Sequence, residues 1–101
     1  MALTKKQVKQ LRSLGHHLDP QVMIGKNGLT PGLVAQAEAT IDQRELIKCS
    51  VLESSPVEAK EAAGALAGEL EAEVVQVIGG RFILYRRTRR DDVKPLELVR
   101  D

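Results

Sequence analysis

The stretch EVVQVIGGRFILYRR, residues 73–87, limits the possible folds more than any other part of the sequence. Two runs rich in β-branched and aromatic residues, a pattern typical of β-strands, flank Gly79 and Gly80. Glycine readily adopts the positive φ values that a tight hairpin turn requires. The sequence therefore predicts that the fold ends in two antiparallel strands joined by this turn.

Residues 4–18 carry the pattern of a first helix. Thr4 followed by Gln7 fits a capping box at its start. We expect the helix to end between Gly15 and Asp19, because Pro20 disfavours helical geometry in the residue before it. Apolar residues at helical spacing define its buried side: Val8, Leu11, Leu14 and Leu18.

Two strands and a second helix follow in the middle of the chain. Residues 21–24 and 46–52 predict the strands, and the second alternates apolar with polar side chains, as a half-buried strand should. Thr30 predicts the cap of the intervening helix, and Pro31 fits its first turn because the missing N–H is harmless there.

A third helix is predicted to follow a second capping box, formed by Ser55 and Glu58 with Pro56 just inside. Alanines and leucines give this helix its apolar side. Gly64 and Gly68 would each weaken an exposed helix by roughly 1 kcal/mol. We therefore expect both glycines to pack closely against the sheet.

The order of these elements predicts the fold class. Helices between the earlier strands act as crossovers and require parallel neighbours, while the final hairpin adds an antiparallel pair. The predicted fold is α/β (α+β), with the order α-β-α-β-α-β-β and a mixed four-stranded sheet packed with helices. A chain of 101 residues fits one domain. We assign residues 1–90 to this domain and residues 91–101 to a charged C-terminal tail.

Several functional classes find no support in the sequence. No stretch approaches the roughly 18 to 20 apolar residues of a membrane span, and the amino end lacks a signal peptide's apolar centre, so we expect a cytoplasmic protein with no membrane contact. Cys49 fits a buried thiol inside a strand. His16 and His17 point roughly 100° apart on a helix and cannot share a metal. We predict no catalytic residue, metal, cofactor or small-molecule substrate, and a monomer.

Charge is distributed unevenly along the chain. Residues 1–37 contain five Lys or Arg against Asp19 alone, and residues 81–90 contain five Arg and no acid. Residues 38–80 instead contain nine acidic and three basic side chains. On the first helix, a uniformly basic stripe of Lys5, Lys9, Arg12 and His16, with Lys6 nearby, lacks the acids that form i,i+4 pairs. Clusters of one sign indicate a partner of opposite sign, and for basic clusters this is most often nucleic acid.

The loop GKNG, residues 25–28, lies between a predicted strand and a predicted helix. A helix amino terminus offers unpaired N–H groups, and glycine lets the backbone approach a phosphate. Lys26 adds a full positive charge. The pattern G-x-x-G also occurs in ordinary structural turns, and this loop is not a P-loop, because Lys26 precedes Gly28.

The loop, the basic stripe and the arginine-rich end together favour RNA. All three suit one polyanionic backbone, and nothing in the chain resembles a module that reads the DNA major groove. A KH domain also carries G-x-x-G, but between two helices, and the extended QVMI before this loop leaves no room for the first of them. The alternative from another class is a protein-interaction module that uses the acidic segment 38–80 to bind ribosomal or assembly proteins.

Residues 3 to about 88 resemble a known family. The stretches LTKKQVKQLRSLGHHLDPQVMIGKNGLTPGLVAQAEATIDQRELIKCSVL and VVQVIGGRFILYRR are similar to the CRM domain (chloroplast RNA splicing and ribosome maturation) of the small bacterial YhbY-like proteins. The resemblance implies a non-catalytic RNA-binding fold similar to the carboxy-terminal domain of translation initiation factor three. It also implies association with ribosomal RNA in precursors of the large subunit.

By position, residues 25–28 match the family's G-x-x-G and the first helix matches its basic helix. Gly80 and Arg81 occupy positions that vary in the family, so we assign them no role. The residues predicted to contact RNA are Gly25, Lys26, Asn27, Gly28, Lys5, Lys6, Lys9, Arg12, His16, Arg86, Arg87, Arg89 and Arg90.

Overall fold

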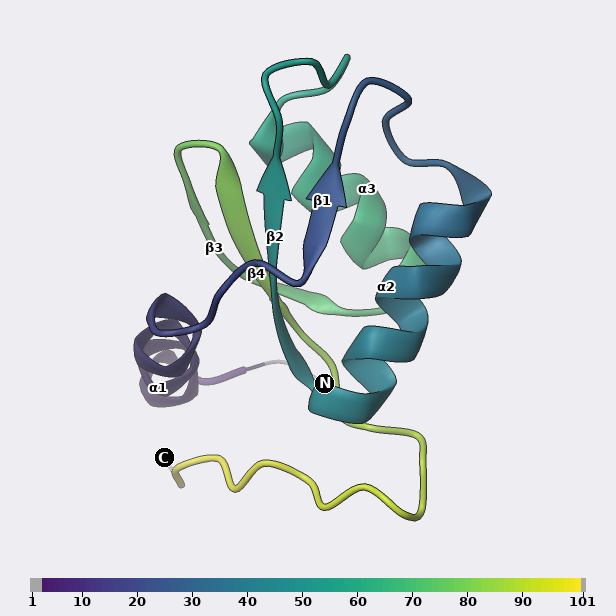
Figure 1. Ribbon diagram of the computed structural model, residues 1–101. Coiled ribbons are helices and arrows are strands. Elements are labelled where there is room, and N and C mark those ends of the chain that lie inside the picture. The colour runs from purple at the N-terminus through teal and green to yellow at the C-terminus, as the bar shows by residue number, and fades with distance from the viewer. Residues whose placement is uncertain (1–2, 101) are drawn as a thin grey trace.

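The protein forms one mixed β-sheet with helices on both faces (Figure 1). The computed structural model describes residues 3–100. Residues 1 and 2 of the predicted domain (1–90) and residue 101 of the predicted tail (91–101) lie outside the described part. The elements are α1 (Lys5–His16), β1 (Val22–Ile24), α2 (Pro31–Arg44), β2 (Leu46–Val51), α3 (Ala59–Leu70), β3 (Glu73–Ile78) and β4 (Arg81–Tyr85). The predicted fold class and element order are confirmed.

The strands lie in the order β1-β2-β4-β3. β1 and β2 are parallel, whereas β4 lies between β2 and β3 and runs antiparallel to both. β2 and β3 therefore run in the same direction without being neighbours, because the second strand of the hairpin fills the place between them. The predicted parallel pairing holds for β1 and β2 alone.

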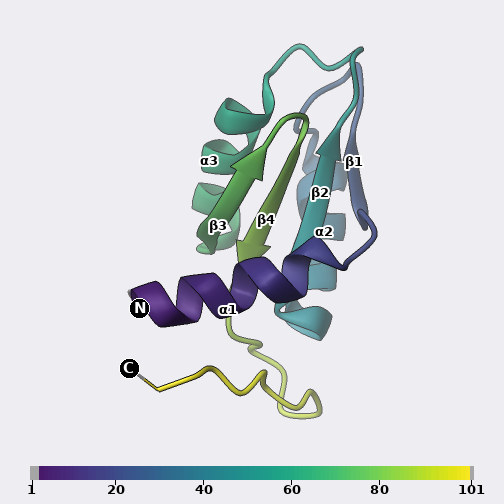
Figure 2. The ribbon, with the colours of Figure 1, turned by 90° about the vertical axis from the view of Figure 1, so that its left-hand side faces the viewer.

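The two faces of the sheet bury two separate apolar clusters. α2 and α3 cover one face, and α1 crosses the lower part of the other (Figure 2). The larger cluster includes Ile47, Cys49, Phe82 and Leu84 from the strands, with Ala37, Ile41, Leu66 and Leu70 from the helices. The smaller consists of Leu11, Leu46, Val75, Ile83 and Tyr85. Because α1 covers only part of its face, the upper part of that face is left uncovered.

Two of the three predicted helix starts are confirmed. The Thr4 hydroxyl accepts from the Gln7 amide at 3.2 Å, and the Gln7 side chain accepts from the Thr4 amide at 3.0 Å. Thr30 likewise accepts from the Leu33 amide at 3.1 Å, with proline in the first turn. These bonds satisfy amide groups that a helix leaves unpaired at its start.

The predicted capping box of the third helix is wrong. α3 begins one residue after Glu58, which makes no side-chain capping bond. The Ser55 hydroxyl instead exchanges hydrogen bonds with the backbone of Val57, two residues ahead, at 2.9 and 3.1 Å. The hydroxyl of serine often forms hydrogen bonds with the backbone of nearby residues, and here these bonds form a turn before the helix.

The glycines of the helices have roles other than those predicted. Gly64 and Gly68 are exposed on α3, and a Cβ added at either would meet no atom of residues 3–100 within 4 Å, so the expected close packing against the sheet is wrong. Gly15 is the glycine that permits a close approach. A Cβ at Gly15 would lie 2.6 Å from the Cδ1 atom of Ile83. The absence of a side chain there lets α1 press against β4.

Residues 86–100 contain no helix or strand and run below α1 (Figures 1 and 2). Gln10 fixes this segment, because its side chain donates to the Glu97 carbonyl at 2.9 Å and accepts from the Val99 amide at 2.8 Å. Gln7 donates to the Val99 carbonyl at 3.2 Å, and Leu98 packs against the smaller apolar cluster. The segment therefore holds α1 against the sheet.

Candidate nucleic-acid interface

The basic stripe of α1 lies on the flank opposite the tail. At 100° per residue, Lys5 lies about 160° from Gln7, and Arg12 about 160° from Gln10, the two residues that bind residues 97–99. The stripe instead faces the uncovered part of the sheet, where the Arg12 guanidinium donates to the Val75 carbonyl at 3.3 Å. Four predicted residues are thereby brought together on one exposed flank: Lys5, Lys9, Arg12 and His16. Lys6 is exposed further round the helix, toward solvent.

The uncovered sheet surface continues from the end of this stripe. Register places Lys48, Ile83 and Gln76 in one row across β2, β4 and β3, and Arg81 and Ile78 in the next row. Residues in neighbouring strands at paired positions share a face, so these side chains lie on the same side as α1. His16 adjoins the first row, because the Lys48 ammonium donates to the His16 carbonyl at 3.5 Å.

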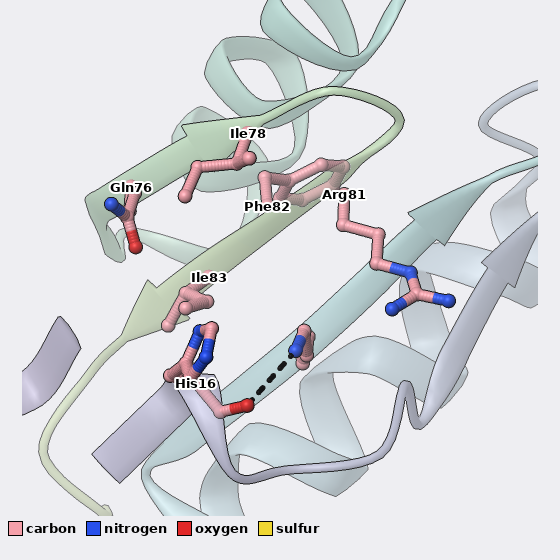
Figure 3. A pocket seen from close by; sticks show the side chains of 7 residues that line it. His16, Gln76, Ile78, Arg81, Phe82 and Ile83 are labelled. Atoms are coloured by element: carbon pink, nitrogen blue, oxygen red, sulfur yellow. Dashed lines mark hydrogen bonds between the residues drawn. The ribbon is translucent and has the colours of Figure 1, made fainter. Parts of the chain in front are cut away.

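A pocket of about 150 Å³ opens where α1 meets this sheet surface (Figure 3). Apolar atoms form most of its lining surface, and Arg81 extends from β4 toward β2 at its rim. The lining residues are His16, Lys48, Gln76, Ile78, Arg81, Phe82 and Ile83. The pocket thus combines apolar surface with the imidazole of His16 and with cationic groups from β2 and β4.

Six side chains on this side of the molecule, five Lys or Arg together with His16, form no ion pair with a carboxylate within residues 3–100. Within residues 3–100, every ion pair of Lys or Arg with a carboxylate involves Arg86, Arg89 or Arg90. The six form what we call the basic face: Lys5, Lys9, Arg12, His16, Lys48 and Arg81. An array of cations without internal counter-ions suits an anionic polymer.

Sequence reasoning missed Lys48 and Arg81. Lys48 occupies a polar position in the alternation of β2, and Arg81 opens the strand after the glycine turn. Period-two alternation separates the two faces of each strand, but the register between β2 and β4, and the side of the sheet that α1 covers, depend on tertiary packing. The alternation in the sequence was therefore the available signal, but it does not show where α1 packs on the sheet.

The GKNG loop is a tight turn whose amides are partly used within the loop. The Gly28 amide donates to the Gly25 carbonyl at 3.0 Å, and Gly28 has a φ of 65°. The Thr30 amide donates to the Gly28 carbonyl, while Thr30 itself caps the helix. Over residues 3–100, no acceptor lies within bonding distance of the Lys26 and Asn27 amides. Of the amides expected to form the cradle, that of Gly28 is thus used within the loop, and the Lys26 side chain is exposed.

The loop lies at the end of the sheet where β1 gives way to α2, far from the tail (Figures 1 and 2). Met23 pairs with Ser50, and Ser50 pairs with Arg81, so these three share one row. With strands about 4.8 Å apart, Arg81 stands about 10 Å from Met23, two residues before the loop. The loop therefore borders the basic face along its upper edge.

The arginines after β4 lie at the opposite end of the sheet from the loop (Figures 1 and 2). Arg86 is also buried, with 6% of its side chain exposed. Its guanidinium donates to the Leu70 carbonyl at 2.9 Å, to Asp42 at 2.5 Å and to Glu38 at 3.4 Å. The prediction that Arg86 contacts phosphate is therefore corrected: it closes an internal network.

Two neighbouring arginines are also engaged. Arg89 pairs with Glu71 at 3.2 Å, and Arg90 pairs with Asp92 at 2.6 Å. The Arg89 amide, followed by the Arg86 guanidinium, stabilises the charged Asp42 carboxylate and lowers its pKa. Arg87 is exposed and has no carboxylate within ion-pairing distance among residues 3–100. Of the predicted cluster, Arg87 alone keeps an unopposed charge.

The remaining candidates for chemistry are structural. Cys49 is fully buried, and burial raises the pKa of its thiol to about 12, so the predicted buried thiol is confirmed. No group of three or more His, Cys, Asp or Glu suited to a metal ion occurs within residues 3–100. Over the same range, no helix has the length and apolar character needed to cross a membrane.

Comparisons with known proteins agree on one family. A family model described as CRS1 / YhbY (CRM) domain matches residues 3–86. "Probable RNA-binding protein PA4753" of Pseudomonas aeruginosa is 36% identical over 87 residues, covering 86% of this chain and 84% of that protein. "Probable RNA-binding protein YqeI" of Bacillus subtilis is 36% identical over 96 residues, covering 95% and 98%. The solution structure of the hypothetical protein SAV1595 from Staphylococcus aureus is similar with a TM-score of 0.75 and 38% identity, covering 94% of this chain and all of that one.

Proposed function

The chain belongs to the CRS1/YhbY (CRM) domain family, and from that premise we propose that it is a non-catalytic RNA-binding protein. The observation that carries the proposal is the basic face, whose cations have no carboxylate partner within residues 3–100. Relatives named as RNA-binding proteins support it, because they match most of the chain. Phosphates supply most of the affinity in such interfaces, and they require cations rather than reactive groups.

The basic face contacts successive phosphates across the uncovered part of the sheet. Lys5, Lys9 and Arg12 engage the backbone on one side, while Lys48 and Arg81 engage it over the strands. At the upper edge the GKNG loop adds a further phosphate contact through Lys26 and the amides of residues 26 and 27. Lys6 and Arg87, exposed away from this path, interact with more distant phosphates.

The partner that we propose is ribosomal RNA in precursors of the large subunit, where binding assists assembly in the cytoplasm. The resemblance to proteins of ribosome maturation supports this partner. A module that binds proteins through the acidic segment finds less support. Glu38 and Asp42 bind Arg86, and the Glu45 carboxylate accepts from the backbone amides of Thr88 and Leu96. Part of that acidic segment is thus satisfied inside the molecule.

Salt dependence of binding tests the proposal with a matched pair of variants. The first replaces Lys5, Lys9 and Arg12 with Gln, and the control replaces three exposed cations elsewhere, Arg44, Lys60 and Lys94, with Gln. Both variants lose the same charge. Affinity for a fragment of large-subunit ribosomal RNA is measured between 50 and 300 mM salt.

Each lost phosphate contact should reduce the log–log slope by roughly 0.7 to 0.9. We expect the first variant to show a slope reduced by about 2 to 3 on this basis, and the control to retain the parent slope within about 0.5. Equal changes in the two variants would show that net charge, and not the basic face, determines binding. Failure of the parent to bind any ribosomal fragment would contradict the proposed function itself.

A further inference from the structure

We propose that the pocket between α1 and the sheet binds one unstacked base of the RNA, so that the protein prefers RNA with an unpaired nucleotide. The pocket is the hollow of about 150 Å³ lined by residues of α1, β2, β3 and β4 (Figure 3). This inference rests on the proposed function, because the same RNA must reach the basic face. Beyond RNA binding in general, the inference specifies that the sheet surface recognises an unpaired nucleotide.

The size of the pocket limits its occupant. Sites for whole cofactors and drug-sized ligands usually measure roughly 300 to 1,000 Å³. A hollow of about 150 Å³ is smaller and has room for one planar ring rather than a complete nucleotide. The sugar and phosphate must then remain outside, at the rim.

The chemistry of the lining matches a base attached to a phosphate. Ile78 and Ile83 offer apolar surface to the face of a ring, and Ile78 keeps 59% of its surface exposed. The Gln76 side chain, which makes no hydrogen bond within residues 3–100, can donate to and accept from a base edge. Lys48 also lines the pocket and Arg81 stands at its rim, so both cations are near the place where the attached phosphates would lie.

The position of the pocket favours an unpaired base over a base in a duplex. A stacked and paired base does not project from its helix, and extruding one costs a few kcal/mol, least where the base is already unpaired. Sequence-specific RNA recognition accordingly targets loops and bulges. Because the basic stripe of α1 ends at His16, beside the pocket, a backbone that follows the stripe passes its rim. A bulged nucleotide in that strand can enter while the flanking stems contact cations.

Two hairpin RNAs test this inference. Their stems and loops are identical, except that one stem contains a single unpaired 2-aminopurine and the other pairs the same nucleotide. The variants are Ile78→Ser, at an exposed position, and Gln76→Ala, at a partly exposed one, and we expect both to fold. Met23→Ser is the control. Met23 is an apolar residue in the same row of the sheet as Ile78 and is 54% exposed, but it does not line the pocket.

We expect the parent to bind the bulged hairpin roughly tenfold more tightly than the paired one, at the lower end of what a bound base contributes. The fluorescence of 2-aminopurine should change on binding. Ile78→Ser and Gln76→Ala should reduce this preference to below about twofold while leaving affinity for the paired hairpin unchanged. Met23→Ser should retain the preference.

Equal binding of both hairpins by the parent would overturn the inference while leaving the proposed function intact. A preference that survives in both pocket variants would also overturn it, because the base would then lie elsewhere. If neither hairpin binds, and the ribosomal fragments also fail to bind, the proposed function fails as well. An acidic peptide that binds more tightly than RNA, and loses affinity on Ile78→Ser, would assign the pocket to a protein partner.

Discussion

Replacing Arg86 with Met should destabilise the fold without weakening RNA binding. Arg86→Met keeps most of the buried apolar stem but removes the donors to Leu70, Asp42 and Glu38. The Leu70 carbonyl then lacks its side-chain donor, and an unsatisfied buried group costs about 1 to 3 kcal/mol. Asp42 and Glu38 lose their cation but stay 23% and 42% exposed, so water partly replaces it.

The expected loss in the free energy of unfolding is about 2 to 4 kcal/mol, less than the roughly 3 to 5 kcal/mol for breaking a fully buried pair. Arg86 also carries a buried Nε atom that has no hydrogen-bond partner within residues 3–100, and its removal offsets part of the cost. In a domain of this size, each kcal/mol shifts Tm by roughly 4 to 8 °C. The melting temperature of Arg86→Met should therefore fall by about 8 to 32 °C.

Thermal and urea unfolding followed by circular dichroism measure this loss. Arg87→Met is the control, at an exposed neighbour that forms no ion pair among the described residues. The control should change stability by less than about 0.5 kcal/mol. At a temperature where both variants are folded, Arg86→Met should bind RNA with the parent's affinity. Parent-like stability, or a tenfold loss of RNA affinity in the folded variant, would refute the internal role of Arg86.

Three further perturbations have expected outcomes. Truncation after Asp92 removes the Leu98 contact and both hydrogen bonds of the Gln10 side chain to the tail backbone. The free energy of unfolding, measured with urea, should fall by about 1 to 3 kcal/mol. RNA affinity should be unchanged, because the tail lies opposite the basic stripe. The lowered pKa of Asp42 means that its stabilising contribution is complete above its ordinary value of 3.8 and is lost as pH falls through the folded value. The parent's unfolding free energy should thus decline below about pH 4, more steeply than that of Asp42→Asn, in acid titrations followed by fluorescent dye binding. Cys49, with its pKa raised to about 12 by burial, should react with a thiol reagent only when the protein unfolds, and rapid labelling of the native protein would contradict this.

Local patterns in the sequence were sufficient to predict the elements and their order. The capping box of Thr4 and the proline-containing start of α2 act within one helical turn, and the glycine turn at Gly79 is equally local. Such features depend on neighbouring residues, which the sequence displays directly. Ser55 is the exception, because two local arrangements compete for its hydroxyl and the turn is the one adopted.

Features that depend on contacts between distant residues could not be predicted in this way. Arg86 and Arg87 are adjacent in sequence, yet one is buried against α2 and the other is exposed. The partner of Arg86, Asp42, is 44 residues away, and only the packing of α2 beside the end of β4 brings them together. Likewise, Lys48 and Arg81 join the basic face because α1 leaves part of the sheet uncovered.

The most direct test of the central claim is a map of backbone amide chemical shifts in 15N-labelled protein as ribosomal RNA is added. The account predicts changes along the basic flank of α1, at the facing positions of β2 and β4, around Lys48 and Arg81, and in residues 25–28. Residues 86 and 89 and the exposed side of α3 should remain unchanged. Changes centred on α3 or on the Arg86 network, with the sheet surface beside α1 unaffected, would contradict it.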